Sequence, residues 1–392
     1  MAYLKELVNK PISGEWGSDG EGIKVLRTTN FTNKGVLNFD NVVTRDISAK
    51  IIEQKKLQKG DLIIEKSGGS PTQPVGRVVY FDEEGDFVCN NFTSILRPKR
   101  EKVFPKYLLH MLFANHKFGI TKMFQNKTTG IINLQLTRYL EKSNIPLPSL
   151  ETQKKIAQLL DEATSLRNKT QEILKEYETL AQSIFLDMFS DPVTNKFKFQ
   201  KGTIRDLINE AKYGTSEKAS DEGKYPYLRM NNLTYEGYMD YSNIKYVNIP
   251  DKDLHKYLVK KGDLLFNRTN SKELVGKTAI FDSADPMVIA GYLIRVRFNE
   301  KANPFFVRAY LNSKYGKLVL RNMCKSIVGM ANINAQELQN ILILHPPIEL
   351  QNKFAEKITL IEQQKELVKQ ELKESENLLN CLLQKAFRGE LV

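Results

Sequence analysis

Residues 151–189 read ETQKKIAQLLDEATSLRNKTQEILKEYETLAQSIFLDMF and contain neither glycine nor proline. Apolar and small residues recur through this stretch at alternating spacings of three and four, the heptad pattern of a helix that packs lengthwise on another helix. The predicted seam consists of Ile156, Leu159, Ala163, Leu166, Thr170, Ile173, Tyr177, Leu180 and Ile184. At about 1.5 Å per residue such a helix is roughly 58 Å long, which is too long to be covered by one small domain.

A second stretch, residues 349–388, repeats this pattern near the end of the sequence. Its seam consists of Phe354, Ile358, Ile361, Lys365, Val368, Leu372, Ser375, Leu379, Leu382 and Ala386, in which Lys365 and Ser375 are the imperfect positions. A chain that runs domain, helix, domain, helix closes most simply when its helices are antiparallel. We therefore predict that the two helices pack on each other in that orientation. The alternative is that each helix packs only on its own domain.

The sequence on either side of these helices repeats itself at an offset close to 200 residues, and the matching blocks keep their order. The matched pairs are LRTTNFTNKG (26–35) with LRMNNLTYEG (228–237), KGDLI (59–63) with KGDLL (261–265), VGR (75–77) with VGK (275–277), GIINL (130–134) with GMANI (329–333), and ETQKKIA (151–157) with ELQNKFA (349–355). Each half of the chain is therefore one copy of a unit of about 200 residues, and the two copies are expected to be related by a pseudo-two-fold axis.

The first part of each copy reads as a mixed α/β domain. Short β-rich runs, such as residues 62–64, 77–81 and 244–247, are interrupted by glycine, proline and asparagine. Helices are expected after Pro105 and Pro304, because proline suits the first position of a helix. The predicted organisation is a domain at 1–150, a central helix at 151–191, a second domain at 192–348 and a C-terminal helix at 349–392. The fold class is α/β, with mixed α+β domains that are duplicated and joined by two long antiparallel coiled-coil helices.

The composition points to an acidic partner. The chain has 392 residues and a net charge of +12, shared equally between residues 1–200 and 201–392. The basic excess lies in the domains, with 7 basic and 2 acidic residues over 101–150 and 6 against 1 over 301–348. Nucleic acid is the leading partner for such a chain. We expect a cytoplasmic protein, because no signal peptide or membrane-length apolar run occurs and the 3 cysteines lie far apart.

The motifs that would carry catalysis are incomplete. Residues 303–306 read NPFF, which lacks the second proline of the loop with which adenine methyltransferases hold their base, and a helix start is the better interpretation. No glycine-rich cofactor turn or P-loop is present. Asp61 and Glu65 do not have the spacing of a nuclease metal site, and the second copy has Asn267 in place of Glu65. We expect no catalytic residues, no metal and no cofactor on this chain.

Polar loops in each copy carry the side chains that base edges and phosphates require. Together with basic residues of the repeated frame, they give a predicted DNA-contacting set, for which ordinary surface turns are the alternative. In the first copy this set is Trp16, Arg27, Lys66, Ser70, Thr72, Gln73, Arg77, Gln125, Lys127, Thr128 and Thr129. In the second copy it is Lys212, Tyr213, Thr215, Arg229, Arg268, Asn270, Lys272, Lys277, Lys325 and Ser326. The loops differ between the copies while the frames around them match, as expected for readers of two different sequences.

The order of domains and helices resembles the specificity subunit of type I restriction–modification systems. The two KGDL frames resemble a strand of that family. IPLPSLETQKKIA (145–157) and LHPPIELQNKFA (344–355) resemble its entries into the spacer helices. LLQKAFRGEL (382–391) resembles its helix end, whereas IFLDMFSDP (184–192) is a degraded form without the glycine. The resemblance covers essentially the whole chain.

The resemblance implies two target recognition domains, each of which reads half of a split, asymmetric site in double-stranded DNA. It also implies two methyltransferase subunits that carry S-adenosylmethionine and methylate adenine N6. Two translocating nuclease subunits can join that core. The rival hypotheses are a self-sufficient methyltransferase or nuclease, which the absent motifs disfavour, and a stand-alone two-domain DNA-binding regulator.

Overall fold

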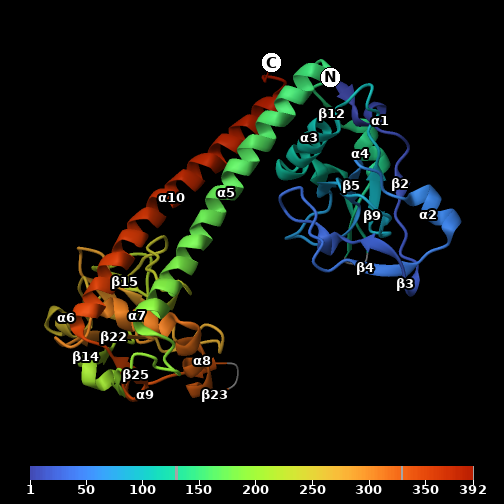
Figure 1. The fold of residues 1–392 in the computed structure, drawn as a ribbon. Coiled ribbons are helices and arrows are strands. Elements are labelled where there is room, and N and C mark those ends of the chain that lie inside the picture. The colour runs from blue at the N-terminus through green and yellow to red at the C-terminus, as the bar shows by residue number, and fades with distance from the viewer. Residues whose placement is uncertain (129–130, 328–329, 392) are drawn as a thin grey trace. The chain divides into compact units, whose positions relative to one another are not determined.

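A computed structural model describes residues 1–128, 131–327 and 330–391, and for residues 127, 128, 325–327 and 330 it describes the backbone only. The chain divides into two compact units. The first unit comprises Met1–Gln171 and Gln370–Val392, and the second comprises Glu172–Lys369. Each unit contains one globular domain and one half of each long helix, α5 (Leu150–Phe189) and α10 (Ile348–Arg388) (Figure 1).

The first domain contains three small sheets of three or four strands. A four-stranded antiparallel sheet has the order β2 (Ile12–Ser13), β9 (Thr93–Leu96), β5 (Leu62–Glu65), β7 (Val78–Tyr80). The second sheet has the order β4 (Val43–Asp46), β3 (Ser18–Leu26), β8 (Phe87–Cys89), and the third has β10 (Gln125–Thr128), β11 (Ile131–Leu134), β6 (Ser67–Gly69). The helices beside them are α1 (Leu4–Leu7), α2 (Ala49–Lys55), α3 (Pro105–Lys117) and α4 (Leu136–Lys142), and β1 (Ala2–Tyr3) pairs with β12 (Asn144–Ile145).

The second domain repeats this arrangement with one additional strand, β17, at the edge of its second sheet, which confirms the duplication. Its four-stranded antiparallel sheet has the order β14 (Ile208–Tyr213), β22 (Leu293–Phe298), β18 (Leu264–Asn267), β20 (Thr278–Ile280). Its other sheets have the orders β16 (Lys245–Val247), β15 (Tyr225–Leu228), β21 (Met287–Ile289), β17 (Leu258–Val259), and β19 (Thr269–Asn270), β24 (Met330–Asn332), β23 (Lys325–Ile327). The helices are α6 (Asp251–Tyr257), α7 (Pro304–Asn312), α8 (Lys314–Met323) and α9 (Ala335–Gln339), and β13 (Gln200–Thr203) pairs with β25 (Leu342–His345).

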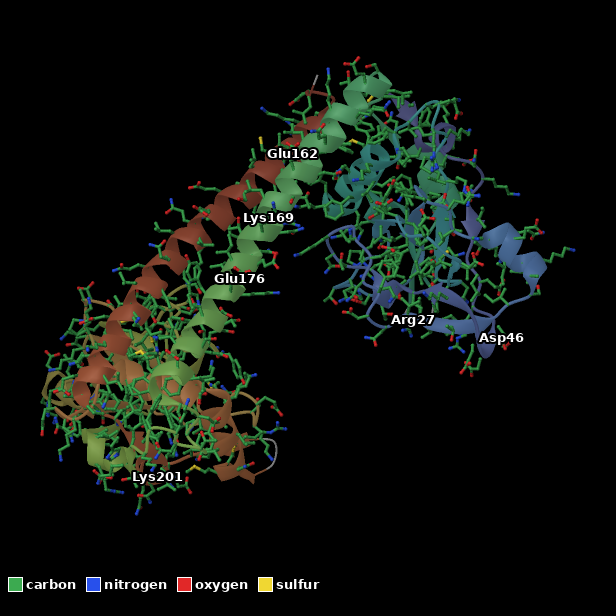
Figure 2. The ribbon with its side chains drawn as sticks, in the orientation of Figure 1. Arg27, Asp46, Glu162, Lys169, Glu176 and Lys201 are labelled. Carbon is green, nitrogen blue, oxygen red and sulfur yellow. The ribbon has the colours of Figure 1, made fainter. Side chains whose placement is uncertain are left out.

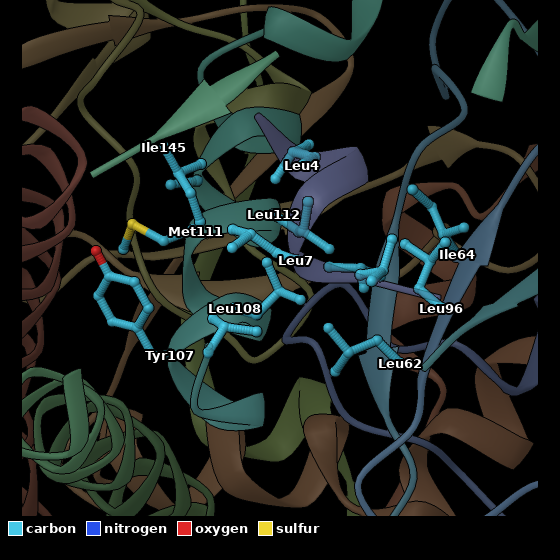
Figure 3. Close-up of a cluster of buried hydrophobic side chains, with 14 of the residues drawn as sticks. Leu4, Leu7, Leu62, Ile64, Leu96, Tyr107, Leu108, Met111, Leu112 and Ile145 are labelled. Carbon is cyan, nitrogen blue, oxygen red and sulfur yellow. The ribbon is translucent and has the colours of Figure 1, made fainter. Parts of the chain in front are cut away.

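The core of the first unit joins its sheet to both long helices. Strand β5 is buried on both faces, which explains why LII at 62–64 is an unbroken apolar run. Leu62 and Ile64 contribute to one cluster and Ile63 to another. The larger cluster includes Leu108 and Met111 of α3 (Figure 3), and it continues to Leu160 and Ala163 of α5 and Leu379 and Leu383 of α10. Domain and helices therefore share one core in this unit.

The core of the second unit is built around aromatic side chains that come from its domain, from α5 and from α10. Phe185 and Phe189 at the end of α5, Phe354 at the start of α10 and Phe306 of α7 pack together, with the rings of Phe189 and Phe306 4.7 Å apart. The start of α5 thus meets the end of α10 in the first unit, and the end of α5 meets the start of α10 in the second. Within each unit the helices are antiparallel, as the order of domains and helices along the chain predicted.

The predicted seam of α10 is largely confirmed, because eight of its ten positions are buried or nearly so and Leu372 and Leu382 are half-buried. Its imperfect positions are also buried. Lys365 is 4% exposed, and its Nζ lies 3.4 Å from Glu178 Oε1, 3.2 Å from the Tyr238 hydroxyl and 4.4 Å from the Tyr238 ring centroid. Ser375 Oγ donates to the carbonyl of Glu371 one turn earlier. Both polar groups are satisfied locally, so the seam tolerates them.

Four of the nine predicted seam positions of α5 are wrong. Leu159, Leu166, Ile173 and Leu180 are 40%, 50%, 39% and 46% exposed, whereas Leu160 is fully buried. The helix has two adjacent rows of apolar residues, one containing Leu159 and the other Leu160. Its contacts with the domain determine which row is buried. Asp161 accepts hydrogen bonds from Lys106 Nζ at 2.9 Å and His110 Nε2 at 2.8 Å, which turns residue 161 toward α3. Residue 159 then lies about 200° away around the helix, on the solvent side.

Adjacent leucines test this assignment directly. We expect Leu160→Ala to lower the free energy of unfolding by about 2–5 kcal/mol, because it opens a cavity in the shared core. Leu159→Ala is the matched control and should change it by about 0.5 kcal/mol or less, because that side chain is at the surface. The measurement is denaturant unfolding of both variants. Equal losses, or a larger loss for Leu159→Ala, would show that the seam runs through the other column.

Candidate nucleic-acid interface

Three of the predicted loops of the first copy converge on one small sheet. Strand β6, which follows Lys66, pairs with β11, and β11 pairs with β10, so the segments 66–74 and 125–128 share the sheet. Ser67 Oγ and Asn133 Oδ1 are 2.5 Å apart across it. The third loop joins through Lys66, whose Nζ donates to Ser13 Oγ at 2.5 Å. Segments that lie far apart in the sequence thus form a single loop cluster, which we define as residues 13–16, 66–74, 125–128 and 131–134.

The second unit forms the equivalent cluster from residues 212–216, 268–272, 325–327 and 330–332. Strand β19 pairs with β24, and β24 pairs with β23. The Arg268 guanidinium lies 4.9 Å from the centroid of the Tyr213 ring, and the Tyr213 hydroxyl accepts a hydrogen bond from Ala335 N at 2.8 Å. Position 268 corresponds to Lys66 at an offset of 202. The same connection between loops is therefore made by different side chains in the two units.

Gly14 and Gly214 explain why the first loop of each cluster can lie so close to the sheet. A β-carbon built on Gly14 would fall 2.0 Å from the carbonyl oxygen of Asn90, and one on Gly214 would fall 2.1 Å from that of Ile289. Only glycine permits this approach. In the first unit the loop is further held by Lys55 of α2, whose Nζ lies 2.8 Å from Glu15 Oε2 and lowers the pKa of that carboxyl.

The turn at Ser70–Gln73 presents polar groups to solvent at the edge of the first cluster. The main chains of Ser70 and Gln73 exchange two hydrogen bonds, at 2.9 and 3.1 Å, and Ser70 Oγ lies 3.1 Å from Thr72 Oγ1. Thr72 and Gln73 are exposed, whereas Gln125 uses its Nε2 to donate to the carbonyl of Val75 at 2.9 Å. Thr72 and Gln73 are therefore available to an external partner.

In the second cluster Lys272 is the exposed cation of the equivalent turn. Asn270 Nδ2 donates to Asn267 Oδ1 at 3.0 Å, and its Oδ1 accepts from Ser271 N at 2.9 Å, so this side chain shapes the turn. Lys212 is exposed but paired with Glu210 at 2.7 Å. Thr215 is 5% exposed, and its carbonyl accepts from the Tyr227 hydroxyl at 3.0 Å, which gives it a structural role.

Arg77 and Lys277, which were predicted to contact DNA, have their donors occupied inside the protein. Arg77 makes a bidentate ion pair with Glu65, both contacts being 2.9 Å, and also donates to the carbonyls of Thr28 and Phe31. The ion pair raises the pKa of Arg77. Lys277 is 8% exposed and donates to the carbonyls of Met230 and Leu233 at 2.7 and 2.5 Å.

These contacts hold the single 3-10 turns η1 (Thr28–Asn30) and η4 (Met230–Asn232) on their domains. Burial lowers the pKa of Lys277, which has carbonyl partners here in place of the carboxylate that pairs with Arg77. The geometry gives Arg77 and Lys277 a structural role.

Arg27 and Arg229 begin these 3-10 turns. Each donates from Nη2 to a carbonyl fourteen residues further on, Arg27 to Asn41 at 3.0 Å and Arg229 to Asn243 at 3.1 Å. Both guanidinium groups are half-buried and brace the loop that follows the turn. Trp16 is also half-buried; its ring stacks on the Arg45 guanidinium at 4.1 Å and packs on the cluster formed by Ile23, Val25 and Val88. These residues stabilise the frame of each domain.

The side chains of five predicted contacts lie outside the described part of the structure. Thr129 is not described, and for Lys127, Thr128, Lys325 and Ser326 only the backbone in β10 and β23 is described. They remain predictions.

Two exposed aromatic side chains were missed by the sequence analysis. Phe92 is 43% exposed, and its carbonyl accepts from Lys66 N and Ser67 N at 2.9 and 3.2 Å. Tyr292, 200 residues later, is 51% exposed, and its carbonyl accepts from Arg268 N at 3.0 Å. Each lies at the base of its loop cluster, where an aromatic face can contact a base or a thymine methyl. These two residues could have been identified from the sequence, because an aromatic residue occurs at equivalent positions of the two copies.

The groups considered for catalysis have structural partners. Asp61 accepts from Arg97 at 2.8 and 2.9 Å, Glu65 from Arg77, and Asp263 from Arg297. Asn303 caps α7, its side chain accepting from Phe305 N at 3.0 Å, so the predicted helix start is confirmed. Within residues 1–128, 131–327 and 330–391 no group of three or more His, Cys, Asp or Glu side chains could hold a metal ion. Over the same residues, no helix has both the length and the apolar content needed to cross a membrane.

Comparison with known proteins agrees with the geometry. The family described as "Type I restriction modification DNA specificity domain" matches twice, over residues 10–177 and 197–377. The chain is 24% identical over 397 residues to the Type I restriction enzyme EcoKI specificity subunit of Escherichia coli K12. It is 23% identical over 390 residues to the StySPI specificity subunit of Salmonella potsdam. Each alignment covers 94% of this chain and 82% of the relative.

Solved structures share the fold. The S subunit of a type I restriction–modification system from M. genitalium superposes with a TM-score of 0.57 at 17% identity, covering 98% of this chain and 95% of that one. A chain from a study of complex assembly and conformational transition in a type I system gives a TM-score of 0.59 at 17% identity, covering 99% and 97%. Specificity subunits are the non-catalytic components of such systems. The two matches, which together span most of the sequence, place this chain in the type I restriction–modification specificity subunit family.

Proposed function

We propose that each unit reads one half of a bipartite, asymmetric site in double-stranded DNA through its loop cluster. The observation that carries this proposal is the convergence of three separate loops on one three-stranded sheet in each unit. The frames of the two clusters match, but their exposed side chains differ: Thr72 and Gln73 in the first unit and Lys272 in the second. Amide and hydroxyl groups discriminate between base edges, while lysine contacts phosphates or guanine.

The chemistry of the complex then belongs to partner subunits. We propose that two methyltransferase subunits supply S-adenosylmethionine and that this chain binds no cofactor itself. Two restriction subunits can complete the complex. The stand-alone regulator is the second candidate, and the exposed apolar residues of α5 argue against it.

The solvent face of α5 supports partner binding. Leu159, Leu166, Ile173 and Leu180 recur at intervals of seven and are exposed. Charged residues flank this stripe at the same interval, namely Glu162, Lys169 and Glu176, which Figure 2 labels along the helix. An apolar heptad column bordered by alternating charges is the surface that a further helix packs on. A regulator without protein partners would not need it, and isolated exposed leucines do not recur in this way.

Lys272 tests the reading surface. Lys272→Ala should weaken binding to cognate duplex DNA by about 1–3 kcal/mol if the side chain contacts a base, or reduce the slope of log K against log salt by about 0.9 if it contacts a phosphate. Lys252→Ala is the matched control, because Lys252 is an exposed lysine of α6 in the same unit but outside the cluster. The measurement is a salt titration of DNA affinity by fluorescence anisotropy. Identical affinity and slope for the two variants would remove the turn at 268–272 from the interface.

Leu166 tests the partner surface. Leu166→Glu should weaken association with the methyltransferase subunit tenfold or more, because it puts a charge in the centre of an apolar contact. Stability and DNA affinity of the isolated chain should stay unchanged. Leu342→Glu, at a 64% exposed position of β25, is the control. Analytical ultracentrifugation of chain and methyltransferase mixtures gives the result, and unaltered association of Leu166→Glu would exclude this face as the docking site.

A further inference from the structure

One exposed cation precedes a strand of the loop cluster in each unit. Lys122 lies in the 3-10 turn η2 (Ile120–Phe124), which leads into β10, and Arg321 lies in the last turn of α8, which leads into β23 (Figure 1). Both side chains are exposed. Among the described residues, neither side chain makes an ion pair or a hydrogen bond. Each cation is therefore available to a partner outside the chain.

The two positions correspond in structure as well as in sequence. The residues before them, Thr121 and Leu320, are 199 positions apart and are both buried. A β-carbon built on Gly76 would fall 2.9 Å from Thr121 Cγ2, and one built on Gly276 would fall 2.7 Å from Leu320 Cδ1. Because the buried residue packs against its domain in the same way in both units, the residue after it lies at the surface in both.

The positive charge is the same in the two copies although the sequence around it differs. Residues 117–124 read KFGITKMF, and residues 316–323, at the same offset, read GKLVLRNM. Of these eight pairs of positions, only 122 and 321 carry a charge in both copies. The backbone differs too, since one stretch contains a 3-10 turn and the other belongs to an α-helix. A charge that both copies carry without an internal partner indicates an external partner common to both.

In the first unit the segment that carries Lys122 is attached to two parts of the loop cluster. The backbone N–H of Gln125, the first residue of β10, donates to the carbonyl of Lys122. Nε2 of His116 lies 3.1 Å from the carbonyl oxygen of Pro74, at the end of the loop 66–74. Lys122 therefore borders the cluster.

In the second unit Arg321 lies close to the exposed turn of the loop cluster. The pKa of Glu273, which follows Lys272 in that turn, is lowered first by hydrogen bonds with its own backbone and with Ser271. The positive charges of Arg321 and Lys272 lower it further. Charges in water act only over short distances, so both cations lie near Glu273. Arg321 thus extends the positive surface of the turn at 268–272.

We propose that Lys122 and Arg321 contact phosphates of the DNA backbone and fix the position of each loop cluster on the duplex. This inference rests on the proposed function. Phosphates are the same at every base pair, so a contact with them requires the same charge in both copies, whereas contacts with base edges must differ between two half-sites. Lys122 and Arg321 meet the first requirement. The exposed side chains of Thr72, Gln73 and Lys272 meet the second.

The salt dependence of DNA binding tests the proposal. Lys122→Gln and Arg321→Gln should each reduce the slope of log K against log salt by about 0.9, and the double variant should reduce it by about twice as much. At about 0.1 M salt each single variant should bind roughly 3- to 10-fold more weakly. The loss should be equal on cognate and non-cognate duplexes, because phosphates carry no sequence information. Fluorescence anisotropy of the full chain with both duplexes gives these values.

Two kinds of control accompany these variants. Lys122→Arg and Arg321→Lys keep the charge and should keep the slope. Lys50→Gln and Lys252→Gln remove exposed lysines of α2 and α6, outside the loop clusters, and should leave the slope unchanged. Every variant should unfold as the wild type does, because the substituted side chains are at the surface.

Unchanged slopes for Lys122→Gln and Arg321→Gln, on a duplex that the wild type binds specifically, would overturn the inference and leave the proposed function standing. A loss at only one of the two positions would overturn their matched role. A loss confined to the cognate duplex would indicate a contact with a base and would also overturn the inference. A wild-type chain that does not distinguish cognate from non-cognate DNA would contradict the proposed function, and the inference with it.

Discussion

The packing of each domain on half of both long helices is the constraint on which the remaining structure depends. In the first unit, Leu160 of α5 and Leu383 of α10 belong to the same cluster as Leu62 of β5. In the second unit, Phe185 and Phe354 have the same role. The compact units therefore divide along the helices, between residues 171 and 172 and between 369 and 370, and not where domains join helices. The sheet of a domain can be oriented by a helix only because the two share a core.

Each domain is held together by contacts that do not involve the exposed side chains of its loop cluster. In both units the 3-10 turn after the Leu-Arg pair, η1 or η4, is held by hydrogen bonds from a side chain to backbone carbonyls. The donor is Arg77, which is also paired with Glu65, in the first unit, and the buried Lys277 in the second. The glycine at 14 or 214 brings a loop against the sheet in the same way. Because the frame does not depend on the exposed side chains of the clusters, those can change without loss of fold, which the proposed reading of two different DNA half-sites requires.

The sequence predicts where the long helices lie better than it predicts which residues pack against them. Both helices begin and end within a few residues of the predicted stretches, because periodicity and the absence of glycine and proline are local properties. The choice between the Leu159 and Leu160 columns is not local, since it depends on Asp161 meeting Lys106 and His110 from another element. Arg77 was predicted to contact DNA because the sequence does not show its partner: its ion pair with Glu65 forms only when β5 and β7 pair. Phe92 was missed because a lone aromatic in sequence does not reveal its exposure.

The central claim is that each unit reads its own half of the DNA site. The most direct test is to exchange residues 1–150 for the corresponding domain of a relative in the living host and to map methylated adenines by single-molecule sequencing. The account predicts that one half of the methylated sequence changes while the other half stays the same. A change in both halves, or in neither, would contradict it.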